Sequence, residues 1–393
     1  MSQSFFYIAN VFEDTVRSQR RITTDSPAAN RKVSQVCQAV RQAGGDARII
    51  SLGRGRSVGT LRRFAATATS IGKVPISYLD FWDVPVLTHA MTMISLCLAV
   101  LRLTERSSVL VFYNCQFHYV LALLAGRLLG RTCILDIEDG YRSDDKSIRN
   151  LPNAVVVRIF NACCNGGAQL ASSALKAQTP ARQTLVCYGV SDPAGASRDW
   201  SGARLQVLLG GSLYRDTGAE LFLQALALLQ AQSPSALRRF HFVVTGFGDF
   251  AAPLQQAAAG DMADFLSFQG NLSAGAYRKI LADSHLGLCL KLPDSSMGAT
   301  TFPSKVVELA SSGLLVVSTR VSDVGLIFDD QTACLLETAT PQALAAALFE
   351  IAQAPGRARD KALKGQQRVA SLLSEEKVGA EVLRFWRGDY AAS

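Results

Sequence analysis

Apolar residues in the first half of the chain form short continuous runs that alternate with amphipathic stretches. The order strand, helix, strand is predicted for residues 5–11, 34–44 and 47–53, and again for residues 108–113, 119–130 and 132–139. Runs that are apolar throughout are typical of strands buried on both faces of a sheet. Strands that alternate with helices favour a parallel sheet covered by helices. The first half is therefore predicted to be an α/β domain.

The second half repeats this pattern after residues 188–204, which are rich in Gly, Pro, Ser and Asp and are typical of a linker. Strands are predicted at 205–209, 240–246, 265–270, 286–292 and 314–319, and helices at 218–232, 274–283 and 304–312. We expect two doubly wound, Rossmann-like domains, residues 1–190 and 204–374, that face each other across a cleft. Ligands of such sheets bind beyond the carboxyl ends of the strands.

Residues 375–393 are predicted to end the fold as a helix that crosses back to the first domain. Val378, Val382, Leu383 and Trp386 recur there at helical spacing.

The segment Val86 to Leu101 contains no Lys, Arg, Asp or Glu. His89 and several Thr and Ser residues interrupt it, and it is shorter than a bilayer span. We interpret it as a buried helix. The alternative is a helix that lies on a membrane surface.

Charge distinguishes the two halves. The net charge of the 393 residues is +8, but residues 1–190 hold 22 Lys and Arg against 12 Asp and Glu, whereas the rest hold 18 against 20. A basic domain beside a near-neutral one indicates an anionic partner, such as a phospholipid surface, a lipid-pyrophosphate carrier or nucleic acid. Solvated loops are the alternative. The positive charge lies mainly on Arg17, Arg20, Arg21, Arg31, Lys32, Arg54, Arg56, Arg62 and Arg63.

The N-terminal residues and the cysteines indicate a cytoplasmic protein. Residues 1–12 lack the basic flank, long apolar core and cleavage site of a secretion signal. Nine scattered cysteines form no CxxC pair and have no histidines at metal spacing, so reduced thiols are expected.

Residues 286–319 carry the most specific chemistry. Pro303 or Ser304 suits a helix start and Gly313 suits its end. A helix N-terminus favours phosphate, and Lys305 adds a full charge in the first turn. Glu308 lies on the same helix face, about 4.5 Å further along the axis. Lys305 could thus meet a diphosphate while Glu308 accepts hydrogen bonds from ribose hydroxyls. An ordinary surface ion pair is the alternative.

The run FPSKVVELASSGLLVVST (302–319) resembles the donor-binding signature of glycosyltransferase family 4 and its GT-B relatives. The resemblance extends to residues 187–192, 207–226, 242–250 and 265–290, and covers about residues 185–345. It implies a GT-B glycosyltransferase whose second domain holds a nucleoside-diphosphate sugar and whose first domain binds the acceptor. Retention of configuration is implied in the same way.

Two departures from the family pattern fall on residues that would touch the diphosphate. Ser212 and Thr217 stand where many members carry Arg and Lys, and Thr300 stands where they carry the first Glu of an E-x7-E pair. Gly246 and Gly248 lack the third glycine of a dinucleotide fingerprint, so a nicotinamide enzyme is not indicated. The expected donor-binding residues are Gly210, Gly211, Ser212, Gly246, Gly248, Lys291, Thr300, Thr301, Ser304, Lys305 and Glu308.

Catalytic roles are expected for Asp139 and His118 besides Lys305. Asp136, Glu138 and Asp139 end a predicted strand, at the mouth of the first domain, and Glu138 stands where the family often has histidine. Asp139 could orient or deprotonate an acceptor hydroxyl, or simply cap a turn. His118 follows a strand and opens a helix, where it could contact the donor sugar or act as a cap.

The sequence contains no D-x-D motif, so no metal and no cofactor are expected, and protein groups should neutralise the diphosphate. We expect transfer to a hydroxyl of a lipid-linked glycan, as in capsule or exopolysaccharide assembly, by a protein at the inner face of the membrane. Nucleic acid is not expected as a partner. A non-catalytic GT-B partner subunit and a nucleotide-sugar 2-epimerase are the alternatives. Nucleotide base, sugar, linkage and oligomeric state stay open.

Overall fold

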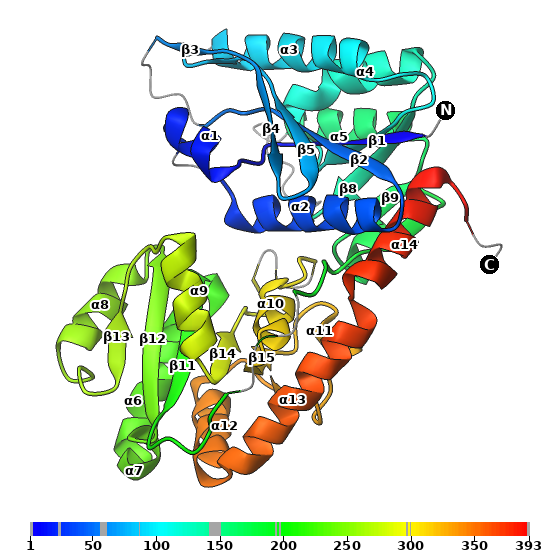
Figure 1. Ribbon diagram of the computed structural model, residues 1–393. Coiled ribbons are helices and arrows are strands. Elements are labelled where there is room, and N and C mark those ends of the chain that lie inside the picture. The colour runs from blue at the N-terminus through cyan, green and yellow to red at the C-terminus, as the bar shows by residue number, and fades with distance from the viewer. Residues whose placement is uncertain are drawn as a thin grey trace. The chain divides into compact units, whose positions relative to one another are not determined.

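The computed structural model describes residues 3–22, 25–55, 61–85, 87–140, 151–192, 195, 198–295, 298 and 300–390. Val86, Arg56 and part of the predicted linker lie outside these residues. The chain forms two compact units, Met1–Val190 with Glu375–Ser393, and Ser191–Ser374 (Figure 1). Each unit is an α/β domain with its own sheet, and the α/β prediction is confirmed.

Unit 1 contains a sheet of eight described strands in the order β10-β9-β8-β7-β1-β2-β5-β4. Neighbouring strands are parallel except for the antiparallel pair β4 and β5, and β3 and β6 form a separate antiparallel pair. The strands are β1 (Ser4–Ala9), β2 (Asp46–Ser51), β3 (Arg63–Phe64), β4 (Thr67–Ile71), β5 (Val74–Tyr78), β6 (Phe81–Trp82), β7 (Val109–Tyr113), β8 (Thr132–Ile137), β9 (Ala168–Leu170) and β10 (Thr184–Val186).

Helices cover this sheet (Figure 1). Helix α2 (Pro27–Gln42) begins where the sequence supplies a cap: Ser26 accepts a hydrogen bond from the backbone of Ala29, and Pro27 opens the helix. The helical elements of unit 1 are α1 (Asp14–Gln19), α2 (Pro27–Gln42), α3 (Leu87–Leu103), η1 (Phe117–Tyr119), α4 (Val120–Leu128), α5 (Leu151–Cys163), η3 (Ser173–Gln178) and α14 (Glu375–Arg387).

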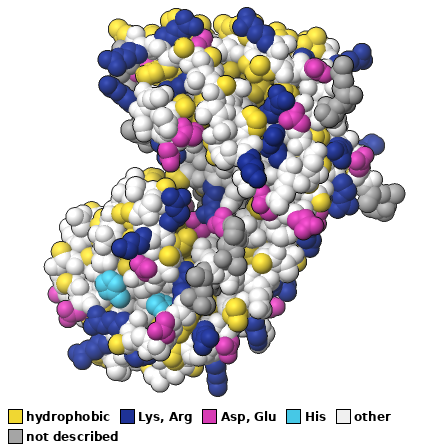
Figure 2. All heavy atoms as spheres, viewed as in Figure 1, with side chains coloured by type: hydrophobic (Ala, Val, Ile, Leu, Met, Phe, Trp, Pro, Cys, Tyr) yellow, Lys and Arg dark blue, Asp and Glu magenta, His cyan; other side chains and the backbone are white. Residues whose placement is uncertain are grey.

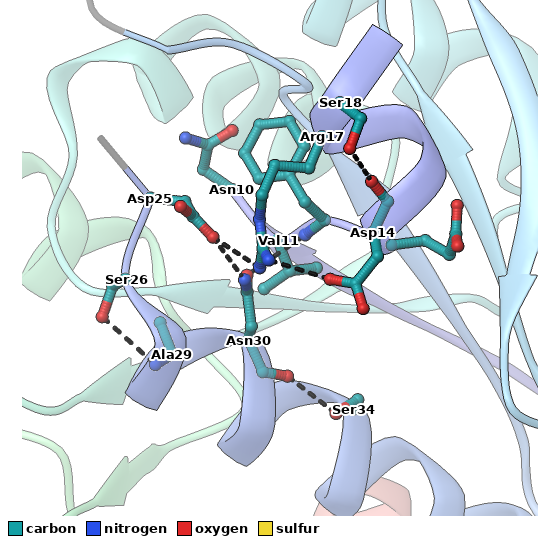
Figure 3. Close-up of polar contacts among 12 residues, drawn as sticks. Asn10, Val11, Asp14, Arg17, Ser18, Asp25, Ser26, Ala29, Asn30 and Ser34 are labelled. Carbon is teal, nitrogen blue, oxygen red and sulfur yellow. Dashed lines mark hydrogen bonds and ion pairs between the residues drawn. The ribbon is translucent and has the colours of Figure 1, made fainter. Parts of the chain in front are cut away.

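The chain between β1 and α2 is held by a polar network (Figure 3). Arg17 pairs with Asp14 at 2.8 Å and with Asp25 at 2.7 Å. The amide of Asn30 donates to Asp25 at 2.8 Å, and its oxygen accepts from the backbone of Phe12 at 3.1 Å. The loop that follows the central strand β1 is thereby fixed to the first turn of α2.

The C-terminal helix α14 packs against α2 within unit 1. Val378, Val382, Leu383 and Trp386 are all buried, as their helical spacing predicts. The indole of Trp386 donates to the amide oxygen of Gln169 at 3.2 Å. The last helix is therefore part of the core of unit 1, although it follows unit 2 in the sequence.

The interpretation of residues 86–101 as a buried helix is wrong in part. Helix α3 turns Thr88, Thr92, Leu96 and Val100 inward, but its opposite face is exposed. Its neighbour α4, which packs against it, also presents apolar residues to solvent. The exposed apolar face of α3 and α4 consists of Leu87, Ile94, Leu98 and Leu101 on α3 and Leu121, Leu124 and Leu128 on α4. Residues 86–101 contain no charged side chain on either side of the helix, so the sequence pattern did not show which side of α3 is exposed.

Unit 2 contains a parallel sheet of six described strands in the order β13-β12-β11-β14-β15-β16. The strands are β11 (Leu205–Ser212), β12 (Phe240–Phe247), β13 (Leu266–Phe268), β14 (Leu286–Cys289), β15 (Leu315–Thr319) and β16 (Cys334–Leu336). The helical elements are η4 (Arg215–Thr217), α6 (Ala219–Gln232), α7 (Pro234–Leu237), α8 (Ala251–Ala259), α9 (Ala274–Asp283), α10 (Lys305–Ser311), α11 (Val324–Ile327), α12 (Pro341–Gln353) and α13 (Pro355–Leu372).

Two global features of the described residues bear on function. None of their helices is long and apolar enough to cross a membrane. None of the nine cysteines, all of which lie in the described residues, forms a disulfide.

Candidate functional site

The carboxyl ends of β11 and β12 lie unusually close together. Gly211 and Gly246 are paired across the two strands and have positive φ angles of 106° and 130°. A Cβ atom on Gly246 would lie 1.8 Å from the carbonyl oxygen of Gly211, and one on Gly248 would lie 2.3 Å from that of Leu213. Only glycine fits such an approach. The predicted Gly-Gly turn is in the structure the end of strand β11, and it forms a tight, side-chain-free surface at the edge of the sheet.

Lys305 lies directly over this turn. Its ammonium donates a hydrogen bond to the carbonyl oxygen of Gly210, and a Cβ atom on Gly211 would lie 2.5 Å from Nζ. Lys305 is the first residue of α10, and the exposed Ser304 precedes it without a side-chain capping bond. Gly313, with a φ of 82°, ends the helix as predicted. A full positive charge is thus held beside the glycine backbone.

Glu308 turns to the same face of α10 as Lys305. Its carboxylate accepts a hydrogen bond from the hydroxyl of Tyr277 at 3.5 Å. The ring of Tyr277 in turn lies against Gly210, where a Cβ atom would be 3.4 Å from it. The structure therefore brings Gly210, Gly211, Lys305 and Glu308 together, and it adds Tyr277 of α9, which the sequence did not single out.

A second lysine lies near the end of β14. Burial raises the pKa of Cys289 to about 11, and the positive charges of Lys305 and Lys291 oppose this rise. Lys291 Nζ donates to the carbonyl oxygen of Thr301 at 3.4 Å, and Thr300 is half-buried beside it. This edge of the sheet is basic, which suits a diphosphate.

Ser212 and Thr217 stand where the family pattern places cations, and the structure shows what Thr217 does instead. Its hydroxyl donates to the carbonyl of Ser212 at 2.6 Å and accepts from the backbone N–H of Tyr214 at 3.0 Å. Ser212 itself is exposed. Thr217 therefore stabilises the turn between β11 and α6.

In unit 1, the loop after β8 is organised by Asn114, which follows β7 and has a positive φ of 60°. Its side-chain oxygen accepts from the backbone N–H of Glu138 at 2.8 Å, and its amide donates to the carboxylate of Asp139 at 3.3 Å. Asp139 is exposed at the carboxyl end of the sheet.

Asp136 does not lie at the mouth of the domain, contrary to the sequence-based expectation. Its side chain is fully buried, where it pairs with Lys32 at 3.1 Å and accepts a hydrogen bond from the hydroxyl of Tyr7. Lys32 also pairs with Glu138. Burial raises the pKa of Tyr7 well above its ordinary value, and the charge of Asp136 raises it further. These buried contacts hold the carboxyl end of β8 in place.

His118 belongs to a cluster with Arg54 and His89 rather than to the Asn114–Asp139 pair. Its Nε2 lies 2.7 Å from Nη1 of Arg54 and 2.8 Å from Nδ1 of His89. Burial, together with the charges of Arg54 and His89, lowers the pKa of His118 to about 4. The sequence showed Arg54 only as one of many basic residues, and His89 only as an interruption of an apolar run.

Comparison with known proteins bears on both units. Residues 204–354 match the model of the family described as Glycosyl transferases group 1. The phosphatidylinositol N-acetylglucosaminyltransferase gpi3 subunit of Schizosaccharomyces pombe is 28% identical over 134 residues, which is 34% of this chain and 26% of the relative.

Solved structures match the chain over nearly its whole length. Anabaena HepE in complex with UDP is similar with a TM-score of 0.67 at 14% identity, over 97% of this chain and 98% of that one. Sucrose-phosphate synthase from Thermosynechococcus elongatus has a TM-score of 0.66 at 14% identity, with full coverage of both chains. The chain has the GT-B fold, and residues 204–354 of unit 2 are similar to the Glycosyl transferases group 1 family.

Proposed function

We propose that this protein transfers a glycosyl unit from a nucleoside-diphosphate sugar to a hydroxyl acceptor. The observation that carries the proposal is the position of Lys305 over the Gly210–Gly211 turn, with Glu308 on the same helix face. The family match covers these residues, and one structure of similar fold is in complex with UDP.

Each group of this site has a role in the proposed reaction. Lys305, assisted by Lys291, stabilises the charge that develops on the leaving diphosphate, and the site needs no metal ion for this. Gly246 and Gly248 let the backbone of β12 approach Gly211 and Leu213 closely, and the hydroxyl of the exposed Ser304 donates to the diphosphate. Glu308, oriented by Tyr277, accepts hydrogen bonds from the ribose hydroxyls. Transfer proceeds with retention, and Asp139 of unit 1 orients the acceptor hydroxyl.

Replacement of Lys305 tests the proposal. Lys305→Ala should raise the barrier by about 2–4 kcal/mol, or lower kcat roughly 30- to 1,000-fold, because a preorganised positive charge beside the leaving group is lost. Lys364→Ala is the matched control, since this lysine is exposed on α13 of the same unit. Product formation from UDP- and GDP-sugars is measured with and without EDTA. Activity of Lys305→Ala equal to that of the control contradicts the donor site, and loss of activity in EDTA contradicts metal independence.

The proposed acceptor is a lipid-linked glycan, as in capsule or exopolysaccharide assembly at a membrane surface. Unit 1 is basic, and the exposed apolar face of α3 and α4 lies beside the exposed Arg102 and Arg106. Figure 2 shows hydrophobic and basic side chains mixed along the upper edge, where Figure 1 places α3. Such a surface suits an anionic membrane. By its name, the curated relative acts on a phosphatidylinositol.

A non-catalytic partner subunit is the second candidate. Ser212 and Thr217 replace the cations of the family pattern, and the curated relative is itself named a subunit. Titration with UDP and GDP separates the two: micromolar affinity supports the enzyme, and no binding up to millimolar nucleotide supports the partner subunit.

A further inference from the structure

Arg54, His89 and His118 form a compact cluster at the carboxyl edge of the unit 1 sheet. Arg54 follows β2, His118 lies in η1 after β7, and His89 lies in the first turn of α3. The three nitrogen atoms Arg54 Nη1, His89 Nδ1 and His118 Nε2 lie within 2.7–3.2 Å of one another. Three elements that are distant in sequence thus converge on one point.

The backbone holds this cluster in place. The amide of Asn10, at the end of β1, donates to the carbonyl of Arg54 at 2.8 Å and accepts from its N–H at 3.2 Å. The rings of His89 and His118 are stacked, with centroids 5.1 Å apart. His89 is exposed, whereas Arg54 and His118 are half-buried, so the cluster is open to solvent on one side.

The three contacts cannot all be satisfied hydrogen bonds. If both imidazole nitrogens accept from Arg54, their lone pairs face each other; if either one is protonated, it faces a guanidinium donor. In the part of the chain that the structure describes, no Asp or Glu pairs with Arg54, and Tyr119 is the titratable neighbour that acts on its charge. An oxygen anion that lies above the plane of the three nitrogens, rather than between them, can accept a hydrogen bond from each nitrogen that carries a proton.

We propose that Arg54, His89 and His118 bind a phosphate group, supplied by the acceptor as a phosphate or pyrophosphate ester. The guanidinium provides charge-assisted donors that phosphate oxygens accept, and the negative charge of a bound phosphate favours protonation of the two imidazoles, which then donate as well. The site lies in unit 1, apart from the residues assigned to the donor diphosphate in unit 2. The assignment of the phosphate to the acceptor rests on the proposed function, whereas the binding of phosphate at this site does not.

The four histidines of the full-length chain allow a direct test. His89 and His118 report on the proposed site, whereas His241 and His285 lie in unit 2 and serve as internal references. The imidazole resonances are followed by NMR at neutral pH during titration with inorganic phosphate and, separately, with geranyl pyrophosphate, a soluble prenyl pyrophosphate. We expect saturable shifts of His89 and His118 with little change at His241 and His285.

Arg54→Gln should weaken binding about tenfold or more, because the strongest charge-assisted donor is lost. Arg48→Gln removes the same charge from the same unit at a half-exposed position on β2 and should bind as the unchanged protein does. An unchanged indole resonance of Trp386, which is buried in unit 1, shows that unit 1 of each variant is folded. Arg54→Lys, which keeps the charge, should restore part of the affinity. Linear, equal shifts of all four histidines, or equal affinity in both Gln variants, would overturn the proposal.

The two ligands distinguish the sources of the phosphate. Tighter binding of geranyl pyrophosphate than of inorganic phosphate supports a prenyl-linked acceptor, and equal binding supports a site that reads the phosphate group alone. UDP titration of the same samples reports on unit 2 independently. Binding of UDP without phosphate-dependent shifts of His89 and His118 would overturn this inference and leave the proposed function standing. Phosphate-dependent shifts of His89 and His118 without binding of UDP would overturn the proposed function and leave the phosphate site standing.

Discussion

The carboxyl edges of the two sheets are both basic, but they are built from different groups. In unit 2, the basic edge is built from glycine backbone and a lysine whose partners lie on neighbouring strands and one short helix. In unit 1, the basic edge is built from side chains alone, and Arg54, His89 and His118 come from three separate elements. The glycine edge tolerates no added atoms, whereas the side-chain edge can rearrange. The first is therefore expected to be rigid and the second adaptable.

The largest effect expected is that of a methyl group on the rigid edge. Gly246→Ala should destabilise the protein by about 3 kcal/mol, because the new Cβ atom would overlap the backbone of Gly211 at a φ of 130°. Chemical denaturation measures this change. Gly275→Ala is the control: it lies in α9 with nothing within 4 Å of its Cβ position and should stabilise the helix by about 0.5–1 kcal/mol. Equal stability of the two variants would contradict the close approach.

The exposed apolar face of unit 1 gives the next largest expected effect. Leu128, at the end of α4, is 87% exposed, so Leu128→Gln should leave the fold unchanged. If the side chain enters a membrane, its loss removes about 1.5 kcal/mol and weakens binding about tenfold. Sedimentation with anionic liposomes at low salt measures this. Leu326→Gln, 63% exposed in unit 2, is the control. Identical sedimentation of both variants argues against this face as the contact.

A smaller effect is expected at Tyr277, which supports Glu308 in unit 2. Tyr277→Phe removes the hydroxyl that donates to the carboxylate at 3.5 Å. The dissociation constant of UDP should rise roughly two- to fivefold, for a loss of about 0.5–1 kcal/mol. Calorimetric titration measures the change. Tyr390→Phe loses a hydrogen bond to Gly166 in unit 1 and should bind UDP normally. An unaltered constant for Tyr277→Phe would separate Glu308 from nucleotide binding.

The smallest expected effect is a change in the pKa of His118 at the side-chain edge of unit 1. Arg54→Gln should raise the pKa of His118 from about 4, because the positive charge that disfavours the imidazolium is removed. The pKa should stay below 6.5, since burial is the larger cause. A depressed pKa makes the fold less stable as the pH falls from 6.5 towards 4, and Arg54→Gln should reduce this loss. NMR titration measures the pKa, which should not change in Arg48→Gln.

The sequence predicted the glycine edge better than the side-chain edge. Lys305, Glu308 and Gly313 lie within nine residues, so helical geometry alone placed them relative to one another. Gly210 and Gly211 could be assigned because a turn after an apolar run is a local feature. Tyr277 was missed because nothing in α9 itself indicates which face meets α10.

In unit 1, local patterns were less informative. Asp136 ends an apolar strand, and only the structure shows that Lys32 and Tyr7 bury it. The two faces of α3 could not be told apart, because Thr88 and Thr92 point inward while leucines point to solvent. Cross-element pairing, and not local polarity, decides burial at these positions.

By itself, the sequence predicted the α/β character of both halves, part of the order of strands and helices, and the helix that carries Lys305 and Glu308, because each depends on periodicity over short segments. Strands β4 and β5 and helices α12 and α13 were not predicted. Tertiary structure alone decided that Arg54, His89 and His118 meet, that Asp136 is buried, and that α3 and α4 share an exposed apolar face. These features depend on how the sheet brings strand ends that are far apart in the sequence to one edge. The spacing of residues along the chain does not show which of these ends lie close together in space.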